Sequence, residues 1–209
     1  MESPRALLSA AKTALYRRPT DELKRLQRWG PRAYLRCGAW AAQMEQAASQ
    51  LPPLPAPTPG ESRALEVWFL TGERFWYQTA FCAWSLARHS DRELVVHLVD
   101  DGSLKPQHEQ QLRRLFPVGI TRWKHQVALD LDLNLPVDQF PVLRQRWSDY
   151  INIRKLTDIH LATSGIKLVL DSDMLFFQRP DELLSWWDQP SQPCLMTDFE
   201  ESYGYSRPL

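Results

Sequence analysis

The sequence has few of the features that mark special protein classes. Its three cysteines, Cys37, Cys82 and Cys194, lie far apart without paired spacing, which argues against a zinc site and against a disulfide framework. We therefore expect a reducing compartment. No apolar run approaches the length needed to cross a bilayer, and the N-terminus lacks the continuous apolar core of a signal peptide. These absences predict a soluble, cytoplasmic protein.

The chain also lacks net charge, and 44% of its 209 residues are apolar, so it has an ordinary globular composition and we expect no nucleic-acid partner. Charge is uneven, however, because residues 1–50 hold nine Lys or Arg against four acidic residues. Possible breaks at Pro19 and at Gly30-Pro31 divide this stretch into two or three predicted helices. Such a basic helical arm either packs on its own domain or a partner, or lies peripherally on the inner membrane face.

A change in composition follows the arm. Five prolines between residues 51 and 60, closed by Gly60, predict a stiff, extended connector, and we place a Pro-rich linker at residues 51–62. The remaining residues, 63–209, form the predicted main domain.

Apolar strands and helices alternate in this domain. The expected strands are 65–71, 93–99, 120–123, 168–170 and 194–196, the expected helices are 77–89, 106–116, 150–163 and 181–187, and residues 124–146 are interpreted as mostly loop. This order predicts an α/β fold with an open, mostly parallel, Rossmann-like sheet covered by helices on both faces. Ligands of such sheets bind beyond the carboxyl ends of the strands, where Thr71, Asp100 and Asp171 are expected.

Two carboxylates follow the strand at 168–170. In an extended backbone Asp171 and Asp173 point to the same side, and carboxylates held close together repel unless a cation lies between them. Mg²⁺ or Mn²⁺ is the simplest such cation and leaves coordination positions for a substrate phosphate. The alternative is that these residues form an ordinary turn or helix cap.

Several segments together resemble the nucleotide-binding half of glycosyltransferases of the A fold, especially the glycogenin-like galactosyl- and glucosyltransferases. The resemblance covers about residues 64–198, and it is carried by VWFLTGERFWYQTAFCAWSLARHS, LVVHLVDDGS, YINIRKLTDIHLATSGIKLVLDSDMLFF and CLMTD. It implies binding of a nucleoside-diphosphate sugar through Mn²⁺ or Mg²⁺ and transfer of the sugar to a saccharide, lipid or protein acceptor.

The resemblance also implies residue roles. Asp173 would bind the metal directly, and Asp171 would contact the ribose, the metal or a metal-bound water. Arg154, or alternatively Lys155, would contact the diphosphate or donor sugar. Thr71 and Asp100 would contact the nucleobase and ribose. Each has a structural alternative, since Arg154 and Lys155 can pair with Asp158 on a helix surface and Asp100 can form a turn.

The sequence departs from that family after the second carboxylate. The family's acceptor-binding half and its further metal ligand, commonly a His, would lie beyond Asp173, but none of the five histidines does. The expectation is an incomplete transferase domain lacking the acceptor half. Alternatives are a phosphatase of the haloacid-dehalogenase type and a non-catalytic interaction domain. Trp186 and Trp187 are either a sugar-stacking platform or part of a core.

Overall fold

The computed structural model describes residues 18–54, 63–161 and 163–194. The chain divides into two compact units, Met1–Leu51 and Pro52–Leu209. In the first unit, α2 (Arg18–Gln50) is interrupted at Gly30, whose φ of 77° and ψ of 161° are non-helical, so the predicted break at Gly30-Pro31 is present. The helix predicted from residue 4 lies outside the described residues up to residue 17.

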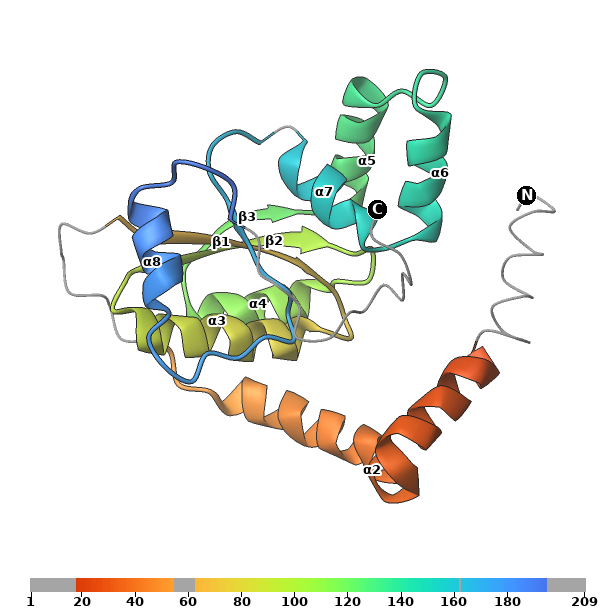
Figure 1. The fold of residues 1–209 in the computed structure, drawn as a ribbon, viewed down its shortest axis with the longest axis vertical. Helices are drawn as coiled ribbons and strands as arrows, with labels where there is room; N and C mark the ends of the chain where they lie inside the picture. The colour runs from red at the N-terminus through yellow and green to blue at the C-terminus, as the bar shows by residue number, and fades with distance from the viewer. Residues whose placement is uncertain (1–17, 55–62, 162, 195–209) are drawn as a thin grey trace. The chain divides into compact units, whose positions relative to one another are not determined.

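The second unit contains a sheet of four parallel strands. They are β1 (Leu65–Thr71), β2 (Leu94–Asp100), β3 (Val118–Arg122) and β4 (Leu168–Val169), arranged in the order β3-β2-β1-β4. β1 and β2 pair along their whole length, from Leu65 opposite Leu94 to Thr71 opposite Asp100. Both strands are mostly apolar because helices cover the sheet on both sides. The predicted open, parallel α/β sheet is therefore confirmed (Figure 1).

Helices α3 (Trp76–Ser90) and α4 (Pro106–Leu115) connect β1 to β2 and β2 to β3, and both lie on one face of the sheet (Figure 1). β1, β2 and β3 follow one another in the same direction across the sheet. Because both connections are right-handed, their helices lie on the same face. The connection from β3 to β4 runs back across the sheet, and its helices lie on the other face. α8 (Asp181–Asp188) follows β4.

Residues 124–146, interpreted as mostly loop, instead form α5 (Lys124–Asn134) and the greater part of α6 (Pro141–Asp149), so that prediction was wrong. The helix expected at 150–163 is shorter, α7 (Ile153–His160). α5 is held by tertiary contacts, since it buries Val127 and Leu131. Asp130 and Asp132, which suggested a loop, pair with Arg122 and Arg144.

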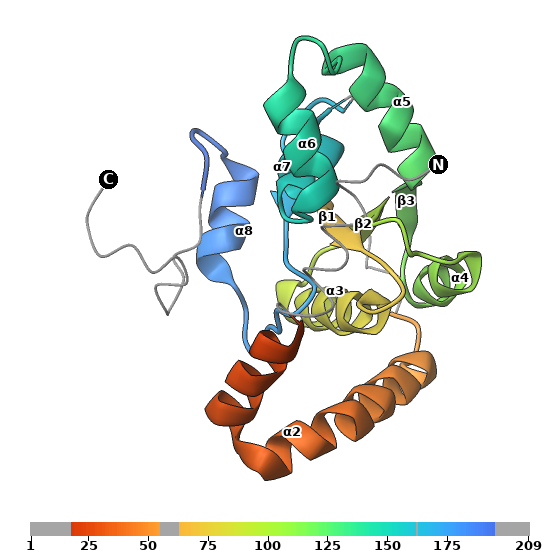
Figure 2. The same cartoon turned by 90° about the vertical axis from the view of Figure 1, so that its right-hand side faces the viewer.

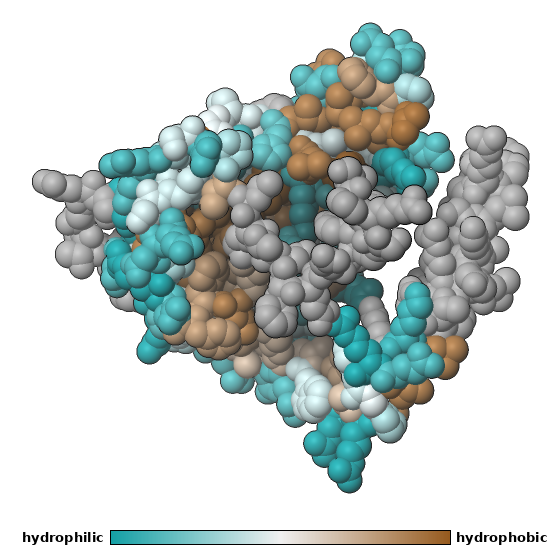
Figure 3. Space-filling model, viewed as in Figure 1, coloured by the Kyte–Doolittle hydropathy of each residue, from teal (hydrophilic) through white to brown (hydrophobic). Residues whose placement is uncertain are grey.

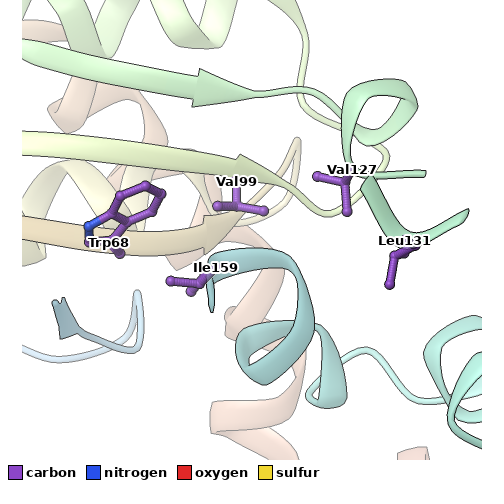
Figure 4. Close-up of a cluster of buried hydrophobic side chains, with 5 residues drawn as sticks. All are labelled: Trp68, Val99, Val127, Leu131 and Ile159. Carbon is purple, nitrogen blue, oxygen red and sulfur yellow. The ribbon is translucent and has the colours of Figure 1, made fainter. Parts of the chain in front are cut away.

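One core cluster joins the two inner strands to α5 and α7. It consists of Trp68, Val99, Val127, Leu131 and Ile159 (Figure 4). Trp68 and Val99 come from the same face of β1 and β2, Val127 and Leu131 from α5, and Ile159 from α7. The cluster fixes α7 over the sheet, which matters because α7 carries Arg154 and Lys155.

α6 contributes no buried residue. Apolar side chains lie on the surface of α5, α6 and their connection, including Leu129, Leu133, Val137 and Val142, which are 64%, 80%, 63% and 73% exposed. Figure 3 shows this apolar surface in brown over α5 and α6.

The first residues of the predicted linker are hydrogen-bonded to the rest of the second unit. The backbone N–H of Leu54 donates to the carbonyl of Leu115 at 2.9 Å, and the Trp84 indole N–H donates to the carbonyl of Pro52 at 3.2 Å. Residues 55–62 of that linker lie outside the described part of the chain. So do residues 195 and 196 of the final predicted strand, while Cys194 has no regular secondary structure.

Candidate functional site

The strand order of the sheet reverses at one definite point. β1 is followed by β2 on one side, whereas the chain later returns to add β4 on its other side. In open α/β sheets, ligands bind where the strand order reverses in this way, outside the carboxyl ends of the two strands. Here those ends are Gly72 after β1 and Asp171 after β4, so the Asp-Ser-Asp segment lies at this switch point.

The segment is a turn and not an extension of the strand. β4 ends at Val169, Leu170 N–H still donates to the Trp68 carbonyl at 3.1 Å, and Met174 N–H donates to the Asp171 carbonyl at 3.3 Å. The argument that Asp171 and Asp173 share a side because the backbone is extended was therefore wrong. Both residues are nevertheless exposed, so both carboxylates are accessible.

The turn is attached to α3. The Ser172 hydroxyl is 2.9 Å from the Thr79 hydroxyl, and Thr79 is also 2.8 Å from the Thr71 hydroxyl. Farther along, Phe176 N–H donates to the Ser85 hydroxyl at 3.1 Å. Figure 2 shows the chain after β4 running past the sheet to α3. These bonds hold the Asp171–Asp173 turn at the edge of the sheet.

Asp171 forms an ion pair with Lys155 of α7. The two side chains are 55% and 30% exposed, so the pair lies at the surface and not in the core. Asp173 has no ion-pair partner among the described residues. The arrangement gives the switch point two accessible carboxylates and one ammonium group.

Arg154, expected to contact a diphosphate, is instead buried and bonded to the chain itself. It is 3% exposed. Its Nε donates to the Asp158 carboxylate at 2.7 Å, Nη1 to the Asp101 carbonyl at 2.5 Å and Nη2 to the Asp100 carbonyl at 3.0 Å. The alternative of a pair with Asp158 is therefore correct in its partner, but the pair is buried and not on the helix surface as that alternative held. Lys155 is the basic residue that faces the candidate site.

Asp100 and Thr71, the expected nucleotide contacts, are also turned inward. Asp100 is 6% exposed, and its carboxylate accepts backbone N–H groups of Gly102, Leu104 and Lys124 at 2.7, 2.9 and 3.1 Å. Thr71 is fully buried against Thr79. Their side chains shape the loops at the carboxyl edge of the sheet.

The structure adds residues that the sequence reasoning missed. A Cβ at Gly72 would overlap the Asp101 carboxylate, so the loops after β1 and β2 lie close together and a larger residue at position 72 would require that side chain to move. Asp101 accepts the backbone N–H and hydroxyl of Ser103 at 2.9 and 2.6 Å. The sequence shows that Gly72 directly follows a predicted strand, which suggests a tight turn. Only the tertiary structure shows that Asp101 is its neighbour.

Cys82 of α3 is near the two carboxylates but does not extend the site. Burial, reinforced by the negative charges of Asp173 and Asp171, raises the pKa of its thiol to about 12. The thiol therefore stays protonated near neutral pH, which disfavours it as a nucleophile or metal ligand.

Trp187 is fully buried, and its indole N–H donates to the Ala64 carbonyl at 3.0 Å. Trp186 donates to the Gln192 carbonyl at 2.7 Å. The core interpretation therefore holds for Trp187, which has no exposed ring face for a sugar.

A groove of about 980 Å³ lies at the opposite edge of the sheet, where β2 and β3 begin. Its lining includes Trp84 and four arginines. Arg92 is bonded to Asp188 at 2.7 and 2.6 Å, Arg113 pairs with Glu109, and the Arg88 guanidinium lies 5.3 Å from the Trp84 ring centroid. These arginines thus already interact with neighbouring side chains.

The switch point offers a divalent cation only a small set of ligands from the described residues. Among the described residues no group of three or more His, Cys, Asp or Glu side chains could hold a metal ion. Asp171 and Asp173 remain suited to Mg²⁺ or Mn²⁺, which often bind through one or two carboxylates and complete their coordination with water and substrate phosphates. At this edge the chain supplies two exposed carboxylates of that kind.

The fold and the edge residues together define an open, parallel, Rossmann-like α/β protein. Comparisons with protein-family models, with curated proteins and with solved structures gave no match. No helix in the described ranges is both long and apolar enough to cross a membrane.

Proposed function

We propose that this protein binds a nucleoside-diphosphate sugar through a divalent metal held by Asp171 and Asp173, for transfer of the sugar to an acceptor hydroxyl. The observation that carries the proposal is the position of these two exposed carboxylates after β4, at the point where the strand order reverses. A nucleotide bound beyond the carboxyl ends of β1 and β4 would bring its diphosphate to this edge.

The surroundings support a phosphate ligand. Lys155 supplies an accessible ammonium group beside Asp171, and such a group can neutralise a phosphate oxygen. A bound Mg²⁺ or Mn²⁺ would act as a Lewis acid and neutralise charge on the departing diphosphate. Lys155 would share that role, while buried Arg154 would position α7 and the loop after β2.

The test is metal-dependent nucleotide binding. With UDP-, GDP- or ADP-sugars at about 100 times their dissociation constant, Mn²⁺ should raise the free energy of unfolding by about 2.7 kcal/mol through mass action. A scan of melting temperature with each nucleotide, with and without Mn²⁺, measures this. A response to phosphate analogues with Mg²⁺ but to no nucleotide would instead favour a phosphatase, and no response to any ligand would favour an interaction domain.

Asp173→Asn should abolish the Mn²⁺-dependent nucleotide response, because a neutral amide is a much poorer ligand for a hard divalent cation. Asp138→Asn, an exposed carboxylate in the connection between α5 and α6, is the matched control and should respond like the unmodified chain. Circular dichroism should show the same fold in all three proteins. Undiminished nucleotide binding by Asp173→Asn would remove this residue from the proposed metal site.

A further inference from the structure

The Lys155–Asp171 ion pair places an ammonium group on a carboxylate that the proposed metal would use. Both groups are partly exposed. The two residues are 16 positions apart in the chain, Lys155 in α7 and Asp171 in the turn after β4. An ammonium and a divalent cation compete for the same carboxylate oxygens. Lys155 Nζ donates to Oδ1 of Asp171, so this bond must open for a metal to replace the ammonium group at that oxygen.

The backbone at Lys155 is firmly held, and its side chain is 30% exposed. Neighbouring Arg154 bonds to Asp158 and to the carbonyls of Asp100 and Asp101, which ties α7 to the loop after β2. The lysine ammonium is at the end of a flexible four-carbon stem. Rotation about the bonds of this stem moves the ammonium group away from Asp171 without movement of α7.

We infer that Lys155 is an exchangeable counter-ion: it neutralises Asp171 before the metal binds, and the metal displaces it to the diphosphate of the nucleotide. The inference rests on the proposed function and adds to it the order in which Asp171 and Lys155 change partners. Without nucleotide, Lys155 and metal compete for Asp171. With nucleotide, the displaced ammonium gains a phosphate partner, so the lysine and the metal act together.

Replacing Lys155 should change the two binding affinities in opposite directions, for Mn²⁺ alone and for nucleotide in the presence of Mn²⁺. An exposed ion pair is worth about 0.2 to 1 kcal/mol, so Lys155→Met should tighten Mn²⁺ binding about 1.4- to 5-fold when no nucleotide is present. A hydrogen bond between charged groups is worth about 1.5 to 3 kcal/mol, so the same variant should weaken nucleotide binding in Mn²⁺ about 10- to 100-fold. A lysine with only a structural role would not produce this reversal.

The experiment is calorimetry of the full chain with Mn²⁺ alone, and then with nucleoside diphosphate at saturating Mn²⁺. Lys155→Arg keeps the cation and should bind Mn²⁺ alone nearly as the unmodified chain does. Lys105→Met is the matched control, because Lys105 forms a comparably exposed ion pair with Glu73 after β1. This control should leave Mn²⁺ affinity unchanged, and thermal melts should verify folding of every variant.

Tighter Mn²⁺ binding together with weaker nucleotide binding in Lys155→Met supports the exchange. Unchanged or weaker Mn²⁺ binding overturns it, even where the unmodified chain binds metal and nucleotide as proposed. If the unmodified chain binds neither ligand, the proposed function fails and the exchange fails with it. The behaviour of the unmodified chain therefore separates the two failures.

Discussion

At the scale of single residues, two adjacent basic side chains on α7 have opposite environments. Arg154 is 3% exposed and makes three charge-assisted hydrogen bonds, whereas the side chain of Lys155 is 30% exposed and pairs with Asp171 at the surface. Asp158, the partner of Arg154, is fully buried and also accepts from Trp147 and Thr157 at 2.7 and 2.8 Å. The buried pair therefore holds the fold, and the exposed pair is available to ligands.

Arg154→Ala should destabilise the protein by about 3 to 5 kcal/mol, because it leaves the buried Asp158 carboxylate without its counter-charge. Urea denaturation followed by circular dichroism measures this. Arg113→Ala is the matched control, since Arg113 also pairs with a residue four positions away, Glu109, but its side chain is 47% exposed. Its cost should stay below about 1 kcal/mol. Equal costs for the two variants would contradict the structural role of Arg154.

At the scale of elements, α5 shows how packing selects a helix from an ambiguous sequence. The residues Val127, Leu129, Leu131 and Leu133 alternate with other residues, which is the spacing of a strand. In the helix, Val127 and Leu131 are four positions apart and both enter the core, while Leu129 and Leu133 are exposed. The contacts with α7 and β2, which come from distant parts of the chain, make the helix the stable choice.

This arrangement gives a paired test within one helix. Leu131→Ala should cost about 2 to 5 kcal/mol, because it opens a cavity in the cluster of Figure 4. Leu133→Ala, two positions away and 80% exposed, should change the free energy of unfolding by less than about 0.5 kcal/mol. Chemical denaturation of both variants is the measurement. Similar values for the two would mean that α5 does not pack as described.

At the scale of the whole molecule, stability should depend on pH through His97, a buried histidine. His97 is 6% exposed, stacks on Trp68 with ring centroids 4.4 Å apart and accepts Ile120 N–H at Nδ1. Its Nε2 is 3.5 Å from the Glu66 carboxylate, too far for a good hydrogen bond, so burial outweighs that charge and lowers the pKa of His97. His160 is exposed, and partial desolvation, with a smaller contribution from Lys167, lowers its pKa as well.

A lowered histidine pKa means that the unfolded chain binds more protons than the folded one below the ordinary pKa of about 6.5. Stability should therefore be retained above that pH and fall as the pH decreases from about 7 toward 5. Urea denaturation at successive pH values measures the slope. His97→Gln should reduce the slope in this window, and an unchanged slope would show that His97 does not carry the effect.

Sequence patterns captured the elements whose apolar spacing agrees with their final packing. β1 was placed at its observed bounds, and α3, β2 and α4 within one residue at each end, because their buried positions follow strand or helix periodicity directly. The candidate carboxylates were also visible, since Asp171 and Asp173 directly follow an apolar strand. The exposed Lys155 was identified only as an alternative to Arg154, because position on a helix does not reveal which of two neighbours faces the sheet.

The sequence by itself determined that strands and helices alternate, and hence that a parallel sheet forms with acidic residues at the carboxyl end of β4. Only the tertiary structure decided which polar groups serve the fold and which remain accessible. Arg154 meets the carbonyls of Asp100 and Asp101, more than 50 residues earlier in the chain. Burial depends on such distant contacts, because strand order and helix packing bring together groups that local sequence keeps apart.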